Sequence, residues 1–325
     1  MADSVDTRVG GGGIDVSDVD ISVVLACYTE RRLPSIRAAL TSLRKQSLEP
    51  RKVVVAVDNN ESLAELLADE CDWVTVVLNT AGRGASATRN RGVECVDTAF
   101  TAFLDDDETA EPDWLVELTR PFSGSNVVGT GGTYEPEWMT GRPVWFPDEF
   151  AWAVGGSYLG LPTVTSPIRN VWSGNMAVRT ELFRTVGGFR TDFGKRGGIP
   201  QPEDTDLCIR MSAATGGHWM YVPSAVILHE VPADRASLPF FISRCYAEGA
   251  GKAVMSRHLA SGSSIDTERD YTRSVAVAAL RRLFAFRRIE FLQGVMMLAG
   301  LVSAGVGYVR GRLVPGVKAE RDVDG

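Results

Sequence analysis

The stretch Phe103-Leu104-Asp105-Asp106-Asp107-Glu108 decides the fold, and it continues an apolar run that begins at residue 99. An apolar run of this length is typical of a buried strand, so the acids stand at the strand's carboxyl end. Open α/β sheets bind their ligands beside the carboxyl ends of the strands. The stretch therefore predicts a ligand cleft that is lined by carboxylates.

Three adjacent aspartates repel one another, so a cation is expected close to them. A hard divalent ion fits this role, because Mg²⁺ takes one or two carboxylates together with substrate phosphates. A second interpretation is a solvated acidic turn before a helix that begins near Pro112, with Glu111 and Asp113 stabilised by the helix dipole. Both interpretations stay open on this stretch alone.

The residues before this stretch predict an alternation of strands and helices. The predicted strands are residues 21–26, 53–57, 73–78 and 99–104. After the first of them, apolar residues recur at the spacing of a helix. Such alternation predicts an α/β fold with a mostly parallel sheet and helices on both of its faces.

Polar side chains follow three of these strands. Tyr28 and Glu30 follow the first strand, Asp58 follows the second, and the acidic run follows the fourth. Because the carboxyl ends of parallel strands meet at one edge of a sheet, we expect these side chains to share a single cleft.

The composition is that of a globular protein. Its 325 residues are 44% hydrophobic, which is enough for a large core in one or two domains. A net charge of −7 argues against a nucleic-acid-binding surface, which needs a basic stripe. Five cysteines without a C-x-x-C spacing indicate buried thiols in a reducing compartment. No signal peptide is expected at the N-terminus.

The segment Gly82-Arg83-Gly84-Ala85-Ser86-Ala87 fits the G-x-G-x-x-A fingerprint of dinucleotide-binding proteins, with Asp105 about twenty residues further on. A nicotinamide-dependent dehydrogenase is therefore a competing hypothesis. That fingerprint belongs to the first strand–helix unit of its fold, whereas two such units precede it here. We favour a tight turn whose following helix turns Ser86, Arg89 and Asn90 toward the cleft.

The middle of the chain is rich in aromatic residues. Trp138, Trp145 and Trp152 lie among prolines and glycines, with Arg142 between them. Aromatic rings beside arginine suit the stacking of a sugar or contact with an apolar lipid. The alternative is that these rings pack a loop onto the sheet.

Two features further along the chain offer chemistry. Glu203, Asp204 and Asp206 begin a predicted helix, where the macrodipole alone would explain them, although such a position can also aim a carboxylate into a cleft. His229 closes a strand predicted at residues 225–228. A single histidine is more often structural than a ligand.

Taken in order, these motifs resemble the family 2 glycosyltransferases of the GT-A fold, over residues 22–229. The motifs are Tyr28-Thr29-Glu30, Asp58, Asp105-Asp106-Asp107, Gly174-Asn175-Met176, Gly187-Gly188-Phe189 and Glu203-Asp204. Residues 138–152 together with Arg169-Asn170 further resemble the glucosyl-dolichyl-phosphate glucuronosyltransferases of archaeal N-glycosylation and their bacterial relatives.

The resemblance implies an inverting transfer of a sugar from a nucleotide-diphosphate sugar, with a uridine nucleotide favoured over a guanosine one. It implies that the nucleotide sugar is bound by Tyr28, Glu30, Asp58, Arg89, Asp105 and Asp106. It implies a Mg²⁺ or Mn²⁺ cofactor held by Asp105, Asp107 and His229. One departure from the family is that Asn59 and Asn60 follow Asp58 in place of Gly-Ser, which leaves the nucleotide contacts open.

The same resemblance implies that Asp204 is the general base and that Glu203 supports it. The acceptor is expected to be a lipid-linked saccharide bound by Trp138, Trp145, Trp152, Arg169 and Asn175. Residues 241–245 stand where processive members carry Q-x-x-R-W, so transfer of one sugar is favoured. A non-catalytic sugar-nucleotide-binding protein on the same fold is the alternative, and the retained acids argue against it.

The predicted domains are a flexible tail at residues 1–18, a catalytic domain at 19–235, a helical region at 236–313 and a second tail at 314–325. Residues 291–309 are an uncharged run of nineteen residues, about 28 Å long as a helix, with arginines on both sides.

This run predicts a membrane-associating helix that either spans the bilayer or lies at its surface. A buried or dimer-forming helix is the alternative, and a homo-oligomer stays open. The expected location is the cytoplasmic face of the cell membrane, with the membrane surface as a partner.

Overall fold

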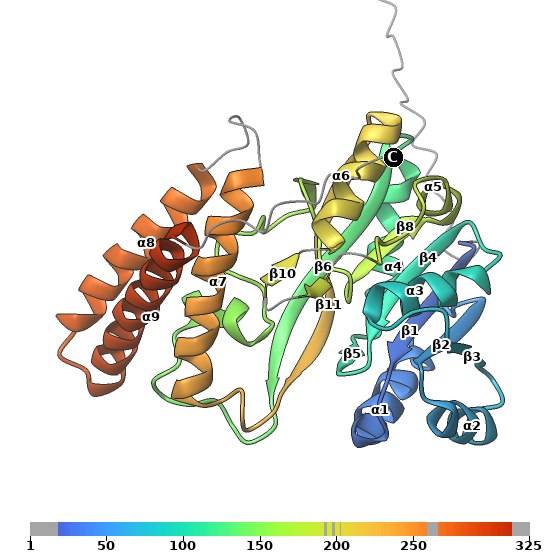
Figure 1. Ribbon diagram of the computed structural model, residues 1–325, viewed down its shortest axis with the longest axis horizontal. Helices are drawn as coiled ribbons and strands as arrows, with labels where there is room; N and C mark the ends of the chain where they lie inside the picture. The colour runs from blue at the N-terminus through green and yellow to red at the C-terminus, as the bar shows by residue number, and fades with distance from the viewer. Residues whose placement is uncertain (1–18, 192–193, 197–198, 202, 259–265, 314–325) are drawn as a thin grey trace, which may run out of the picture. The chain divides into compact units, whose positions relative to one another are not determined.

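The computed structural model describes residues 19–191, 194–196, 199–201, 203–258 and 266–313, and Figure 1 shows the chain. The chain divides into two compact units. The first comprises residues 1–133, 162–194 and 202–227, and the second comprises 134–161, 195–201 and 228–325. The two predicted tails, at 1–18 and 314–325, lie outside the described residues.

The four predicted strands are confirmed in the first unit. They are β1 (Ile21–Cys27), β2 (Lys52–Asp58), β3 (Thr75–Asn79) and β4 (Phe100–Asp105). β3 begins two residues later than the prediction of 73–78. The short helix η2 (Glu30–Arg32) and the helices α1 (Leu33–Leu43), α2 (Glu61–Glu70) and α3 (Ala85–Glu94) connect them.

The predicted parallel sheet forms from these four strands in the order β3-β2-β1-β4. Val24 of β1 pairs in register with Val54 of β2 and Phe103 of β4, and all three pairings along this order are parallel. The carboxyl ends of β1, β2 and β4 are therefore neighbours. This adjacency brings the polar residues that follow them to one edge, as the sequence predicts.

Antiparallel strands complete a mixed nine-stranded sheet beyond β4. They are β8 (Met176–Arg179), β6 (Val127–Trp138), β11 (His218–Val231), β5 (Glu108–Ala110) and β7 (Ser166–Ile168). β8 pairs antiparallel with both β4 and β6. The connecting helices are α4 (Trp114–Thr119), η3 (Arg120–Ser123), α5 (Thr180–Thr185) and α6 (Glu203–Thr215).

Helices cover both faces of the parallel strands. Side chains on both faces of β1 are buried, which requires cover on each side. On one face α3 lies so close that a Cβ on Gly92 would collide with Val24 and crowd Ala56. The same face carries a core of residues far apart in the sequence, including Phe103, Phe189 and Trp219.

The prediction that His229 closes a strand is wrong. β11 continues to Val231, so His229 lies within the strand, and His218 is the residue that stands at a strand end. The predicted strand at 225–228 was too short because the polar and charged residues on both sides of it hide the strand's period of two.

The second unit contains the end of β6, the helix η4 (Asp148–Val154) and three long helices. These helices are α7 (Leu238–His258), α8 (Asp266–Leu283) and α9 (Arg288–Leu313), which lie side by side in orange to red in Figure 1. Two short strands, β9 (Gly194–Arg196) and β10 (Ile199–Gln201), pair with each other.

The aromatic segment supplies the core of this second unit. Phe146 and Phe150 are buried, and both rings lie against Phe241 of α7, with centroids 5.7 and 5.3 Å away. The segment therefore packs onto the C-terminal helices, whereas the sequence offered packing onto the sheet as an alternative. The compact units for this reason do not follow a single boundary at residue 235.

α9 is the one helix among the described residues that is long and apolar enough to cross a membrane, with a mean hydropathy of 1.6 in its most apolar window. The predicted membrane-associating run at 291–309 lies within it.

Candidate active site

A cleft of about 340 Å³ lies in the first unit, at the carboxyl ends of β1, β2 and β4. It is lined by Ala26, Cys27, Tyr28, Arg32, Asp58, Gly84, Ala85, Thr88, Arg89, Asp105, Asp106 and Asp107. Five of the six residues predicted to bind the nucleotide sugar are among them. The parallel order of the strands brings these residues together from segments up to about eighty positions apart.

Arg89 of α3 is a buried cation beside the acidic run. Its Nη2 donates to Oδ1 of Asp105, and its guanidinium lies 5.6 Å from the ring centre of Phe189. Burial lowers the pKa of Arg89, but the charge and hydrogen bond of Asp105, together with the charges of Glu203 and Glu108, outweigh burial and raise it overall. Among the residues that the structure describes, Nε and Nη1 of Arg89 have no hydrogen-bond partner. The cleft thus contains a charged donor with unused hydrogen-bonding capacity.

Arg32 is a second cation at the acidic run, and sequence reasoning missed it. Its Nη1 donates to Oδ1 of Asp106, and its Nη2 lies 3.2 Å from Oδ2 of Asp107. Its guanidinium carbon lies 5.6 Å from the ring centre of Tyr28. The available signal was position, because Arg32 comes five residues after the end of β1, the strand that ends beside the acids.

The acidic run is not a solvated turn. Asp106 is almost wholly buried, and its Oδ2 has no hydrogen-bond partner in the described part of the chain. Burial raises the pKa of Asp106 to about 7, while Arg32 opposes this shift and Asp107 adds to it. The side chain of Asp107 is 13% exposed. A buried cluster of this kind requires compensating positive charge, which Arg32 and Arg89 supply in part.

Asp58 holds the glycine-containing turn at the entrance to α3. Its Oδ2 accepts from the backbone N–H of Gly84 at 2.8 Å, and its Oδ1 accepts from Asn79 at 3.3 Å. Gly84 has a φ of 109°, which side chains rarely adopt. The G-x-G segment is therefore a turn fastened by the cleft's own carboxylate, in the third strand–helix unit of the sheet.

Tyr28 and Glu30 lie at the outer rim of this edge. The ring of Tyr28 is 54% exposed, so a flat group could stack on it. Glu30 accepts from the hydroxyl of Ser62 at 2.6 Å, and hydrogen bonds led by this one lower its pKa. Asn60 donates to the backbone oxygen of Tyr28 at 3.1 Å, so the unusual Asn59-Asn60 pair braces this rim.

Glu108 is the functional candidate whose role sequence reasoning missed. It is buried, and its Oε2 accepts from the backbone N–H of Asp105 at 2.9 Å, closing the turn between β4 and β5. Burial raises its pKa, and the charges of Asp105 and Asp107 add to the effect. A Cβ on Gly174 would collide with its carboxylate, so that glycine makes room for it.

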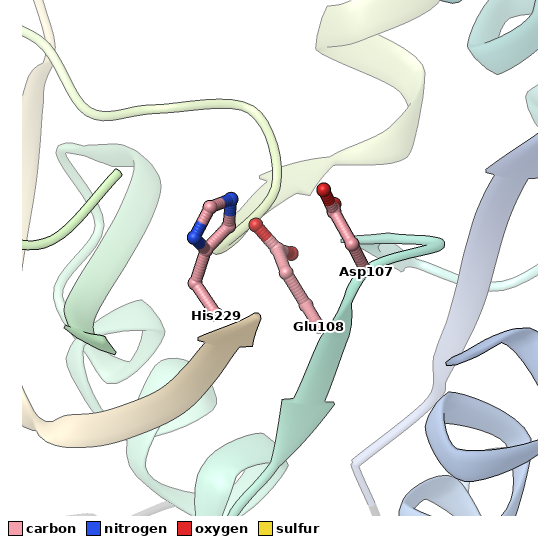
Figure 2. Close-up of side chains that lie close together, drawn as sticks. All are labelled: Asp107, Glu108 and His229. Atoms are coloured by element: carbon pink, nitrogen blue, oxygen red, sulfur yellow. The ribbon is translucent and has the colours of Figure 1, made fainter. Parts of the chain in front are cut away.

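Asp107 and Glu108 can act together on a cation. Figure 2 shows their carboxylates directed to the same side of the turn. One carboxylate oxygen from each lies within 4.8 Å of the other. Two buried, hard oxygen donors at this spacing fit a divalent ion.

Asp204, the predicted base, lies in the first turn of α6. Burial, and after it the charge of the adjacent Glu203, raise the pKa of Asp204 to about 6, while the Thr205 N–H and Arg89 oppose the shift. The backbone N–H of Thr205 donates to Oδ1 of Asp204 at 2.7 Å. The carboxylate of Asp206, one turn into the same helix, pairs with Arg210 at 2.7 Å.

Asn175, a predicted acceptor contact, makes its hydrogen bonds inside the sheet. Asn175 is fully buried at the start of β8, where its Oδ1 accepts from Trp114 at 2.8 Å. Its amide donates to the backbone oxygens of Thr133 at 2.9 Å and Ala225 at 3.0 Å. Asn175 is thus a link between strands, and no part of it is left to face an acceptor.

The other predicted acceptor residues are partly or fully accessible. Trp138, Trp145 and Trp152 are half-buried against the core of the second unit. Trp152 donates to the hydroxyl of Tyr271 at 2.8 Å. Arg169 is exposed in the first unit, and its Nε donates to Asn170 at 3.1 Å. Their role toward an acceptor stays a prediction.

His229 belongs to the second unit and is drawn on β11 in Figure 2. It is buried, and a Cβ on Gly155 would collide with its ring, so a glycine with a φ of 93° is needed beside it. Its Nε2 lies 3.5 Å from Arg235. Its role as a metal ligand stays a prediction.

Comparison with known proteins identifies the class. Residues 22–187 match the model of glycosyl transferase family 2. Glucosyl-dolichyl phosphate glucuronosyltransferase of Haloferax volcanii is 30% identical over 91% of this chain and 97% of its own. Succinoglycan biosynthesis protein ExoM of Rhizobium meliloti is 27% identical over 85% of this chain and 90% of its own.

Solved structures share the fold. A mannosyltransferase of Pyrobaculum calidifontis, in complex with GDP-Man and Mn²⁺, aligns with a TM-score of 0.56 at 16% identity. The alignment covers 91% of this chain and 88% of that one. The polypeptide GalNAc-T7, solved with UDP, GalNAc and Mn²⁺, aligns with a TM-score of 0.51 over 79% of this chain and 54% of its own.

The fold is that of a GT-A glycosyltransferase. The chain belongs to glycosyltransferase family 2 and is of the same type as the glucosyl-dolichyl phosphate glucuronosyltransferase. The competing hypothesis of a nicotinamide-dependent dehydrogenase is therefore wrong. Its fingerprint matched because a tight glycine turn before a helix is needed in both folds.

Proposed function

We propose that this glycosyltransferase moves one sugar, with inversion, from a nucleotide-diphosphate sugar to a hydroxyl of a lipid-linked saccharide, and that the reaction depends on a divalent metal. The observation that carries the proposal is the cleft itself. Three carboxylates at the end of β4 share it with a buried arginine, and a carboxylate of raised pKa begins α6 in the same unit.

The metal would be held by Asp107 with Asp105, and the structure adds Glu108 as a candidate. Each offers hard oxygen atoms, and the buried, crowded acids favour a cation beside them. When bound, Mg²⁺ or Mn²⁺ supplies neutralisation of the charge that develops on the leaving diphosphate. His229 is retained as a third proposed ligand on the resemblance to the family.

The chain's own residues would perform the remaining steps. Asp204 would accept the proton of the attacking hydroxyl, because burial and Glu203 raise its pKa to about 6 and so make it a better base than an ordinary aspartate. Arg89 would hold Asp105 in place and offer its unpartnered nitrogens to an anionic group of the donor. Tyr28 and Asp58 would bind the nucleoside.

The acceptor is proposed from two lines of support. The relative that is 30% identical is a glucosyl-dolichyl phosphate glucuronosyltransferase, so the substrate in its name is lipid-linked. α9 is apolar enough to associate with a membrane. We therefore propose a polyprenyl-linked saccharide, reached at the cytoplasmic face of the membrane where nucleotide sugars are made, with Trp138, Trp145, Trp152 and Arg169 as acceptor contacts.

Either a uridine or a guanosine nucleotide is compatible with the relatives, because the two solved neighbours contain UDP and GDP-Man. We propose uridine on the resemblance stated above. Calorimetric titration of UDP and GDP, each with Mn²⁺ and with EDTA, tests this choice together with the metal.

We expect one of the two nucleotides, UDP or GDP, to bind in the presence of Mn²⁺ and to lose its affinity for the protein in EDTA. Asp107→Asn should weaken the Mn²⁺-dependent binding, and Asp113→Asn, an acid beyond β5 that does not line the cleft, is the matched control. Equal affinity in Mn²⁺ and EDTA would remove the metal from the proposal. No binding of either diphosphate would remove the donor.

A further inference from the structure

The turn between α8 and α9 carries two large apolar side chains in water. Phe284 is 73% exposed and Phe286 is fully exposed. Phe286 also has a φ of 52°, which a bulky residue rarely adopts. Ile289, in the first turn of α9, is half-exposed. We call residues 284–289 the α8–α9 corner.

An exposed apolar stripe continues from this corner along α9. Its members recur every three or four positions, apart from one gap of seven, which places them on a single face of the helix. They are Leu292, Val295, Val302, Val306, Val309 and Leu313. Nothing among the described residues of the second unit covers this stripe.

The opposite face of α9 is already used inside the second unit. A Cβ on Gly300 would collide with Phe150 of η4 and crowd Phe241 of α7. One on Gly307 would collide with the backbone of Tyr246, and one on Gly311 would collide with the backbone of Ala250. These small residues of α9 therefore pack against η4 and α7 of the same chain.

These contacts also argue against a helix that crosses the bilayer. The partners on α7 follow in the same order as those on α9, so the two helices run alongside each other in the same direction. The stretch of α7 beside the apolar centre of α9 carries Arg244 and Glu248, which are partly exposed and 3.8 Å apart. A spanning α9 would draw these charges into hydrocarbon, which is costly.

Charge selects the partner of this surface. Residues 271–313 contain seven arginines and one glutamate, whereas the whole chain has a net charge of −7. Two of the arginines, Arg287 and Arg288, lie within the corner, and Arg310 and Arg312 lie at the far end of α9. Exposed apolar groups flanked by arginine suit a lipid bilayer, whose anionic headgroups attract the arginines and whose acyl chains accept the apolar groups.

We propose that the second unit binds an anionic phospholipid bilayer from one side, with Phe284 and Phe286 inserted among the acyl chains and the apolar stripe of α9 lying in the interface. Membrane binding is argued from the second unit alone. Only its use, which is to bring the enzyme to a lipid-linked acceptor, rests on the proposed function. This binding replaces a transmembrane anchor with a one-sided, reversible attachment.

Flotation of the full-length protein with lipid vesicles tests the surface. Vesicles of phosphatidylcholine with phosphatidylglycerol should carry the protein, and pure phosphatidylcholine should carry much less. Phe284→Ser combined with Phe286→Ser should reduce binding about tenfold or more, because each ring removes a large apolar area from water. Leu159→Ser with Val164→Ser is the matched control, since both residues are exposed but lie outside α8 and α9.

The charge is tested by Arg287→Gln with Arg288→Gln. Binding to the anionic vesicles should fall about fivefold for each arginine removed, and it should fall in the wild type as salt is raised. Binding that is equal for both vesicle types, or unchanged by either double substitution, would overturn the proposal.

Topology is tested by epitope tags at the N-terminus and the C-terminus of the chain expressed in bacterial cells. One-sided binding predicts that both tags are protected from protease in intact spheroplasts and that both are cleaved after lysis. Cleavage of one tag alone in intact spheroplasts would show a spanning helix and overturn the proposal. A second outcome would also overturn the proposal. If light scattering shows dimers that the phenylalanine variant dissociates, and the wild type does not bind vesicles, then the partner of this surface is a second copy of the chain.

Nucleotide binding separates this inference from the proposed function. The phenylalanine variant should bind UDP or GDP with Mn²⁺ as the wild type does, because the corner is not part of the cleft. If the wild type binds vesicles but neither nucleotide, the proposed function fails and the membrane surface stands. If it binds a nucleotide but no vesicle, the membrane surface fails alone.

Discussion

Arg89 of α3 donates to the carboxylate of Asp105 at the end of β4, and the arginine is 4% exposed while the aspartate is 31% exposed. The pair joins a helix that covers the sheet to the strand that delivers the acidic run. A buried guanidinium is stable only when its charge is matched, so each partner fixes the other. The ion pair therefore holds the acidic run at the end of β4 in place before any ligand binds.

Replacing this arginine should affect both folding and binding. Arg89→Met keeps the length of the side chain but leaves Asp105 without its cation, so we expect a loss of about 2 to 3 kcal/mol in the free energy of unfolding, measured in urea. Nucleotide affinity should also fall. Arg91→Met is the matched control on the same helix, because Arg91 is exposed and pairs with Glu94. Equal stability of the two variants would contradict the structural role of Arg89.

Asp204→Asn should leave donor binding nearly unchanged and reduce turnover about 10² to 10⁴-fold, which is the usual contribution of a positioned base. Glu203→Gln should cost less. If Glu203→Gln removes turnover while Asp204→Asn abolishes binding of the donor, the two roles are reversed.

The pH dependence follows from the direction of the shift. Asp204 must be ionised to act, and its pKa is raised from 3.8 to about 6, so kcat/KM should rise with pH and level off above about 6. The same shift disfavours the charged form in the folded state, so this group's contribution to stability is lost as pH rises through 6. Asp204→Asn should therefore be more stable than the wild type at pH 8. A flat kcat/KM profile between pH 5 and 8 would exclude Asp204 as the base.

Asn175→Ala tests whether this residue is structural. The change would leave the indole N–H of Trp114 and two backbone oxygens without partners in a fully buried place, so we expect a loss of at least about 2 kcal/mol in the free energy of unfolding. Asn170→Ala, five positions away and partly exposed, is the control and should be near neutral. An Asn175→Ala variant with normal stability and a raised KM for the acceptor would restore its predicted role.

The packing of α9 against α7 predicts opposite effects on stability for Gly→Ala changes at two positions of α9, Gly307 and Gly305. Gly307→Ala would place a methyl group against the backbone of Tyr246, so it should destabilise the protein by about 1 to 3 kcal/mol. Gly305→Ala meets nothing within 4 Å, so it should be neutral or stabilising by up to about 1 kcal/mol, because alanine favours a helix. Urea unfolding of both variants measures the difference. The same response from both would mean that the two helices do not pack as described.

The sequence predicted the parallel half of the sheet because each strand there is a short apolar run that ends in a polar residue. It also predicted which strand ends share the cleft, since a parallel order makes their carboxyl ends neighbours. His229 shows where this reasoning failed, because polar and charged residues interrupt the apolar alternation of β11 and made the strand look shorter than it is.

Burial was the property that the sequence could not supply. Glu108 and Asn175 stand in motifs that read as site residues, and only the packing shows that one closes the β4–β5 turn and the other links strands. Arg32 was missed for the converse reason, since a charged residue at the start of a helix normally faces water. The aromatic segment likewise forms a core through its contacts with α7, which the sequence did not predict.

The measurement that tests the central claim most directly is the transfer of a radiolabelled sugar to membrane lipids. The full-length protein is incubated with a panel of UDP- and GDP-linked sugars, Mn²⁺ and a lipid extract that contains polyprenyl-linked saccharides. We expect that one donor yields labelled lipid and that EDTA abolishes the product. Asp204→Asn should reduce the rate of sugar transfer about 10² to 10⁴-fold. Labelling that persists in EDTA, or that is equally fast with Asp204→Asn, would contradict the central claim.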